Sequence, residues 1–120
     1  MAIYTQLPIY HAAYNLLLSV NRMLPDLPRI CRYTIGQDVT HDLMEILTLI
    51  YRASRSPAKS LMIGQMRDIL QQVQVRFRLL SDMRSLSMNH YAVLIEQTES
   101  MSKQMAAWEK STLKIEKNVT

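Results

Sequence analysis

Arginine is the residue type in this chain whose number and spacing point most directly to a binding chemistry. Nine of the ten basic side chains before residue 100 are arginines, and six of those nine fall in two short windows. The windows consist of Arg22, Arg29 and Arg32, and of Arg76, Arg78 and Arg84. A guanidinium group donates hydrogen bonds in a planar fork that matches a phosphate or a carboxylate. Arginines gathered in this way therefore favour an anionic partner.

The whole net charge of +4 comes from these two windows. Each window contains one acid, Asp26 or Asp82, while the rest of the chain balances eight bases against eight acids. If the fold brings the windows together, the molecule has one cationic end that attracts phosphate groups. The sequence leaves two interpretations open. The arginines are either a footprint for nucleic acid or another anionic partner, or a solubilising surface with local ion pairs.

The composition favours helix over sheet. The 120 residues include only two glycines and four prolines, whereas leucine, methionine, glutamine, arginine and alanine are abundant. A hydrophobic fraction of 48% with mixed charges is typical of one folded domain. The longest apolar run, at 46–51, is too short to cross a membrane, and no basic region precedes the first apolar stretch. We therefore expect a cytoplasmic protein without a membrane partner.

Apolar residues recur every three or four positions through most of the chain, which predicts helices. Prolines in the Leu-Pro-Asp-Leu-Pro segment at 24–28 interrupt this spacing. Ser56 and Pro57 suit the cap and the first position of a new helix. The four expected helices span about 8–23, 28–54, 56–83 and 89–110.

Short connections make sequential helices pack antiparallel. The expected fold class is therefore all-α, an antiparallel up-down-up-down four-helix bundle over residues 1–110. The apolar spacing fades beyond Lys110, so we expect residues 111–120 to form a flexible C-terminal tail.

In that topology the first and third turns lie at the same end, so the two arginine windows converge. Tyr33, His90 and Tyr91 lie near this end and are candidates for stacking on bases. Arg76 and Arg78 point to nearly opposite sides of their helix because they are two residues apart. They therefore cannot both face one ligand from a monomer, whereas an assembly of several copies, or a pole that wraps around its partner, could use both.

Other residue types give little sign of catalytic or metal chemistry. Asp38, His41 and Glu45 share one helix face, but a carboxylate-bridged di-metal bundle needs a second Glu-x-x-His pair, which the sequence lacks. We interpret them as a solvated acidic face, with metal binding as the alternative. The single cysteine, Cys31, fits a buried structural thiol. No glycine-rich phosphate loop, catalytic triad or CxxC pair occurs, so we expect no enzyme activity and no cofactor.

The stretch from Arg29 to Val39, Arg-Ile-Cys-Arg-Tyr-Thr-Ile-Gly-Gln-Asp-Val, resembles a known four-helix-bundle family. That family contains the accessory variability determinant proteins of diversity-generating retroelements and relatives encoded in intervening sequences of large-subunit ribosomal RNA. The short first helix, the Leu-Pro-Asp-Leu-Pro turn and the helical stretch from Tyr91 to Trp108 support the resemblance, which covers residues 9–108. The turn near Ser56 is closer to the retroelement branch.

This resemblance implies a non-enzymatic accessory protein in a homopentameric, barrel-like assembly with a positive surface. It also implies binding to the reverse transcriptase of the element and to its template RNA and cDNA, in support of mutagenic cDNA synthesis for retrohoming. The alternative is an rRNA intervening-sequence-type bundle that acts as a protein–protein interaction module. The family supplies no residue motif to carry over, so the six window arginines are assigned to nucleic-acid and partner binding from their spacing alone.

Overall fold

The computed structural model describes residues 3–119, which are almost entirely helical. This described part of the chain contains no strand, so the prediction of an all-α protein is confirmed. The four long helices are α1 (Pro8–Met23), α3 (Gln37–Arg55), α4 (Lys59–Asp82) and α5 (Met88–Val119). The shorter segments are the 3-10 turns η1 (Tyr4–Gln6) and η2 (Leu24–Asp26), helix α2 (Arg29–Cys31) and the π-helical η3 (Arg32–Gly36).

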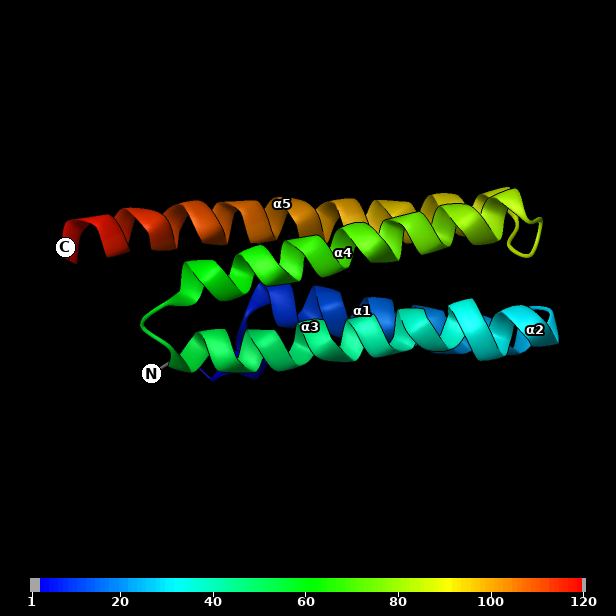
Figure 1. Ribbon diagram of the computed structural model, residues 1–120, viewed down its shortest axis with the longest axis horizontal. Helices are drawn as coiled ribbons and strands as arrows, with labels where there is room; N and C mark the ends of the chain where they lie inside the picture. The colour runs from blue at the N-terminus through cyan, green and yellow to red at the C-terminus, as the bar shows by residue number, and fades with distance from the viewer. Residues whose placement is uncertain (1–2, 120) are drawn as a thin grey trace.

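The long helices run along the major axis of a molecule that measures 51 × 22 × 20 Å (Figure 1). Helix α3 packs against α1 and α4, and α5 packs against α4 and α1, so that each long helix has two long neighbours. Figure 1 shows α2 and the turn between α4 and α5 at one end of the molecule. The loop between α3 and α4 and the last turn of α5 lie at the other end.

The core follows the helical period because every third or fourth residue of each long helix faces its neighbours. Phe77 is the largest fully buried side chain, and it lies in α4. Burying an aliphatic or aromatic side chain of this kind contributes roughly 1.5–3 kcal/mol. Other fully buried side chains come from all four long helices and include Leu16, Leu43, Ile46, Ile50, Met66, Leu80, Met101 and Met105.

Local signals predicted the limits of α1 and the start of α5 correctly, whereas the start of α4 and the end of α5 differ from the prediction. The first predicted helix agrees with α1, and Ser87 caps α5 by accepting a hydrogen bond from the backbone N–H of His90 at 3.1 Å. Helix α4 begins at Lys59, not at Pro57. The Ser56 hydroxyl accepts from the backbone N–H of Ala58 at 3.0 Å, so it stabilises the turn before the helix.

The C-terminal segment also differs from the expectation of a flexible tail, because α5 continues as a helix to Val119. Thr112 is buried, and the Glu116 carboxylate accepts hydrogen bonds from the hydroxyl and the backbone N–H of Ser60, at 2.5 and 3.2 Å. The hydrogen bond from the Ser60 hydroxyl and then that from its backbone N–H lower the pKa of Glu116. This carboxylate caps the N-terminus of α4, where a negative charge is favourable. A contact between residues so far apart leaves no trace in local apolar spacing.

Candidate nucleic-acid interface

The two turns beside the arginine windows lie at the same end of the molecule. The Cys31 sulfur, near the first turn, lies 3.3 Å from the Ser85 hydroxyl in the turn between α4 and α5. A cavity of about 160 Å³ at this end has walls from α1 and α5, and Figure 1 shows the two turns together. We call this end, formed by residues 22–34 and 78–90, the arginine pole.

Three of the six window arginines are exposed and free. The side chains of Arg22, Arg29 and Arg84 have no hydrogen bond, ion pair or ring contact with any other residue in the described range 3–119. Arg22 lies in the last turn of α1, where the partial negative charge of the helix end favours a cation. These three guanidinium groups keep all their donors available for an external anion.

Arg84 has a backbone conformation that is unusual for its residue type. Its φ angle is 58°, in the left-handed region. The N–H of Arg84 bonds to the carbonyl of Ser81 at 3.0 Å and that of Ser85 to the carbonyl of Leu80 at 2.9 Å. This pattern is a Schellman motif, in which glycine is the usual left-handed residue. An arginine at this position costs about 1–2 kcal/mol, and it places a free cation at the tip of the pole.

Arg32, by contrast, is engaged within the protein. Its Nε donates to the carbonyl of Leu24 at 3.1 Å, and its Nη2 donates to the carbonyls of Pro25 and Leu27 at 2.9 and 3.2 Å. The guanidinium carbon also lies 5.9 Å from the centre of the Tyr33 ring. Arg32 therefore holds the turn after α1 in place and has few donors left for a ligand.

The second window is divided in the same way. The Nη1 of Arg76 forms an ion pair with the Asp42 carboxylate of α3, and both side chains are largely buried. Burial raises the pKa of Asp42, and the neighbouring Arg76 guanidinium offsets that rise only in part. Arg78 is exposed, and its Nε lies 3.7 Å from Oδ2 of Asp82. An exposed pair of this kind is weak, so Arg78 can leave Asp82 and bind an external anion. Arg76, by contrast, belongs to the contact between α3 and α4.

The pole also presents ring and apolar surface. Tyr33 is 56% exposed and His90 is exposed, whereas Tyr91 is half-buried against the core. Ile30 and Met88 are exposed to 73% and 72%. The pole thus combines free cations with apolar side chains, an arrangement that suits a partner with both anionic and apolar groups.

Asp38, His41 and Glu45, which the sequence places on one face of the second predicted helix, lie in α3. Among the described residues, no group of three or more His, Cys, Asp or Glu side chains is placed to hold a metal ion. Asp38 and Glu45 are exposed, and His41 lines a groove between α1 and α3. Cys31 is buried, as predicted for a structural thiol.

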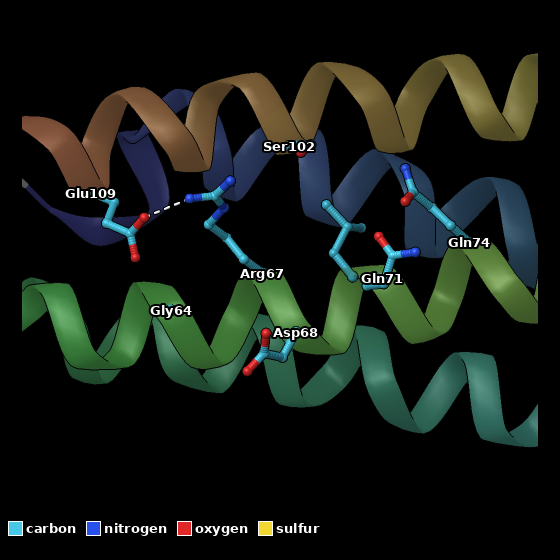
Figure 2. Close-up of a pocket in the computed structure, with 8 residues that line it drawn as sticks. Gly64, Arg67, Asp68, Gln71, Gln74, Ser102 and Glu109 are labelled. Carbon is cyan, nitrogen blue, oxygen red and sulfur yellow. Dashed lines mark hydrogen bonds and ion pairs between the residues drawn. The ribbon is translucent and has the colours of Figure 1, made fainter.

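A polar groove of about 330 Å³ between α4 and α5 was not predicted from the sequence. Figure 2 shows Arg67 reaching from α4 toward α5, where its Nη1 lies 2.5 Å from Oε1 of Glu109. Farther along, Gln74 Nε2 donates to the hydroxyl of Thr98 at 3.0 Å. These polar groups are partners of one another, so the interactions across the groove hold α4 and α5 together.

A cluster of tyrosines along α1 and α3 also escaped the sequence analysis. The Tyr4 ring makes edge contacts with Tyr10 and Tyr51, with centroids 5.5 and 5.1 Å apart. The Tyr10 and Tyr14 rings are nearly parallel, at 14° and a centroid separation of 6.1 Å. The available signal was two tyrosines four residues apart on a helix without any acidic residue.

The fold and this surface define an all-α protein with a cationic end built from two turns. Within residues 3–119, no helix combines the length and the apolar character that membrane crossing requires. No protein-family model matches the chain, and no curated protein sequence matches it. The function is therefore argued from the chemistry of the arginine pole.

Proposed function

We propose that this chain is a non-enzymatic accessory protein of a diversity-generating retroelement. In this proposal it acts in the cytoplasm, binds the reverse transcriptase together with template RNA and cDNA, and supports mutagenic cDNA synthesis. The observation that supports the nucleic-acid part is the meeting of two arginine-bearing turns at one pole, where the side chains of Arg22, Arg29 and Arg84 have no partner in the described chain.

The proposed mechanism is electrostatic positioning. Phosphate groups bind the free guanidinium groups through paired charge-assisted hydrogen bonds. Arg32 and the Schellman motif before Ser85 hold the two turns that carry these groups. A rigid cationic surface of this kind fixes the path of the nucleic acid relative to the polymerase and contributes no chemical step.

Assembly is the second part of the proposal. A net charge of +4 is modest for a single nucleic-acid-binding protein, and several poles in one oligomer concentrate the field. We infer that the long helices form an antiparallel up-down-up-down bundle, with which their contacts are compatible. The resemblance to the accessory-protein family suggests that five copies associate.

The exposed apolar side chains at the pole support a protein partner beside the nucleic acid. Ile30 and Met88 are among the most exposed apolar residues described, and an apolar centre within a charged rim is typical of protein interfaces. We propose that the reverse transcriptase covers these side chains while RNA follows the arginines.

The decisive experiment measures RNA binding by fluorescence anisotropy at several salt concentrations. We expect affinity that falls as salt rises, because phosphate contacts release counterions. A triple variant, Arg22→Gln, Arg29→Gln and Arg84→Gln, should reduce the slope of log affinity against log salt by up to about 2. The matched control removes the same charge from exposed lysines of α5 through Lys103→Gln, Lys110→Gln and Lys114→Gln. Absence of RNA affinity at low salt would exclude the nucleic-acid part.

The second candidate function is the protein–protein interaction module of the intervening-sequence type, which the exposed Ile30 and Met88 also favour. Such a module co-purifies with a protein partner and has no RNA affinity at any salt concentration. The genomic surroundings separate the two branches, since a retroelement places a reverse transcriptase and paired template and variable repeats beside this gene.

A further inference from the structure

A groove runs along the face between α1 and α3, on a different part of the surface from the pole. One hollow of about 400 Å³ is lined by the four clustered tyrosines, and the next, of about 430 Å³, extends to Leu24 beside the first turn. Met44 lines both hollows, so they lie next to each other along this face, and we call them together the α1–α3 groove. Helix α1 has 16 residues and is therefore about 24 Å long. The groove follows most of that length and ends at the arginine pole.

The walls of the groove present aromatic surface to solvent. Tyr14 is 44% exposed and Tyr51 is 38% exposed. Tyr10 and Tyr14 already form a nearly parallel pair, so a further planar ring can continue that stack on the exposed side of Tyr14. Between the rings, the half-buried side chains of Leu17 and Leu47 line the hollow. This surface suits flat, partly apolar groups, a description that fits nucleobases.

No acid lines either hollow of the groove, and α1 contains none. The three acids of α3 are Asp38, Asp42 and Glu45. Asp38 and Glu45 are three and four residues from His41, so they lie at the edge of the hollow that His41 lines. Asp42 is paired with Arg76 of α4. The lining itself therefore carries no negative charge.

Arginines lie at the Tyr51 end of the groove. The Arg55 guanidinium carbon lies 5.4 Å from the centre of the Tyr51 ring, and Arg55 donates to the Tyr51 hydroxyl. Arg52 is exposed on the same turn of α3. Arg22 lines the cavity between α1 and α5 instead. The aromatic wall of the groove thus continues into a pair of exposed cations.

We propose that the α1–α3 groove binds a single-stranded segment of nucleic acid, with bases stacked on Tyr14 and Tyr51 and the backbone directed toward Arg52 and Arg55. This inference rests on the proposed function and specifies that the nucleic acid bound at the groove is single-stranded. Unpaired bases offer free ring faces, whereas the bases of a duplex are stacked on one another. The phosphates of such a segment are complementary to the arginines beside Tyr51 and to a lining without acids, whereas a protein helix offers the same complementarity only if it is strongly acidic.

The test compares binding of a fluorescein-labelled single-stranded oligouridine and of an RNA duplex of equal length by anisotropy. Tyr14→Ala should weaken oligouridine binding roughly 5-fold to 100-fold, because one stacked base is lost. The salt dependence should not change, because no charge is removed. Tyr14→Phe keeps the ring and should bind like the parent protein. Duplex binding should change less than 2-fold, and circular dichroism should show an unchanged fold because Tyr14 is exposed.

The outcomes separate this inference from the proposed function. If RNA binding depends on the pole arginines but Tyr14→Ala binds oligouridine like the parent, the groove inference is wrong and the proposed function stands. If the parent protein binds no RNA, both are wrong. If Tyr14→Ala retains RNA and loses co-purification with the reverse transcriptase, the occupant of the groove is a protein, which also overturns the inference. Cross-linking of a 4-thiouridine oligonucleotide to a groove tyrosine, mapped by mass spectrometry, is the positive result expected.

Discussion

The arginine pole and the contacts between the long helices use the same side chain in opposite ways. Between helices, each guanidinium meets a carboxylate, as in Arg76 with Asp42 and Arg67 with Glu109. At the pole, three guanidinium groups meet no carboxylate in the described chain. The position of an arginine along the sequence does not decide whether it is paired or free. That depends on whether the fold places a carboxylate opposite its guanidinium group. The comparison predicts that arginines between helices carry stability and that free arginines carry binding.

The largest expected effect comes from breaking the pair between α3 and α4. Arg76→Leu leaves the Asp42 carboxylate largely buried without its counter-charge, and its side chain is only 14% exposed. We expect the free energy of unfolding to fall by about 2–3 kcal/mol, somewhat less than for a fully buried pair. Urea denaturation measures this loss, and RNA affinity per folded molecule should stay at the parent value.

The same variant should show a defined pH dependence. Burial raises the pKa of Asp42 in the folded state. The folded protein thus holds the Asp42 carboxyl proton more tightly than the unfolded chain does. The contribution of this proton to the free energy of unfolding is complete below the pKa of the unfolded chain, and it is lost as the pH rises through the pKa of the folded protein. Removing Arg76 raises that pKa further, and the deficit of Arg76→Leu should therefore shrink as the pH is lowered. A deficit that is constant with pH, or an equal deficit in the exposed control Arg78→Leu, would contradict the role of Asp42.

A smaller effect is expected at the turn that Arg32 holds. Arg32→Lys keeps the charge but replaces a planar fork by a single ammonium, which cannot reach the carbonyls of Leu24, Pro25 and Leu27 in the same geometry. We expect a loss of about 1–2 kcal/mol in the free energy of unfolding. The matched control is Arg29→Lys, which changes a free and exposed arginine in the same way. Equal unfolding midpoints for the two variants would show that the carbonyl contacts contribute nothing.

The features that the sequence predicted correctly depend on neighbouring residues. Apolar spacing predicted the all-α class and the limits of α1, and the composition predicted the buried Cys31. Short connections predicted that the turns beside the two arginine windows lie together, as the contact between Cys31 and Ser85 shows. The partners of Arg32 and Arg76 were beyond prediction, because they depend on which carbonyl or carboxylate the packing brings opposite.

The α1–α3 groove is a second feature that local spacing could not predict. Tyr10 and Tyr14 have the spacing of core residues, yet Tyr10 is half-buried and Tyr14 is 44% exposed. A groove wall and a core face share one period, since both lie toward a neighbouring helix. Only the width left between α1 and α3 distinguishes the two, and that width is set by side chains of both helices.

The smallest expected effect has the opposite sign and separates the pole most sharply from the helix contacts. Arg84→Gly removes a left-handed conformation that costs a residue with a side chain about 1–2 kcal/mol. The greater freedom of glycine in the unfolded chain offsets about 0.5–1 kcal/mol of this gain, so the free energy of unfolding should rise by roughly 0.5 kcal/mol. RNA affinity should fall at the same time, because a free cation is lost. Arg84→Ala is the control: it loses the same cation and keeps the strained backbone, so its affinity should fall without the gain in stability. A lower unfolding midpoint for Arg84→Gly would mean that this arginine, like Arg32 and Arg76, contributes to the fold, and the distinction between free and paired arginines would then fail at the tip of the pole.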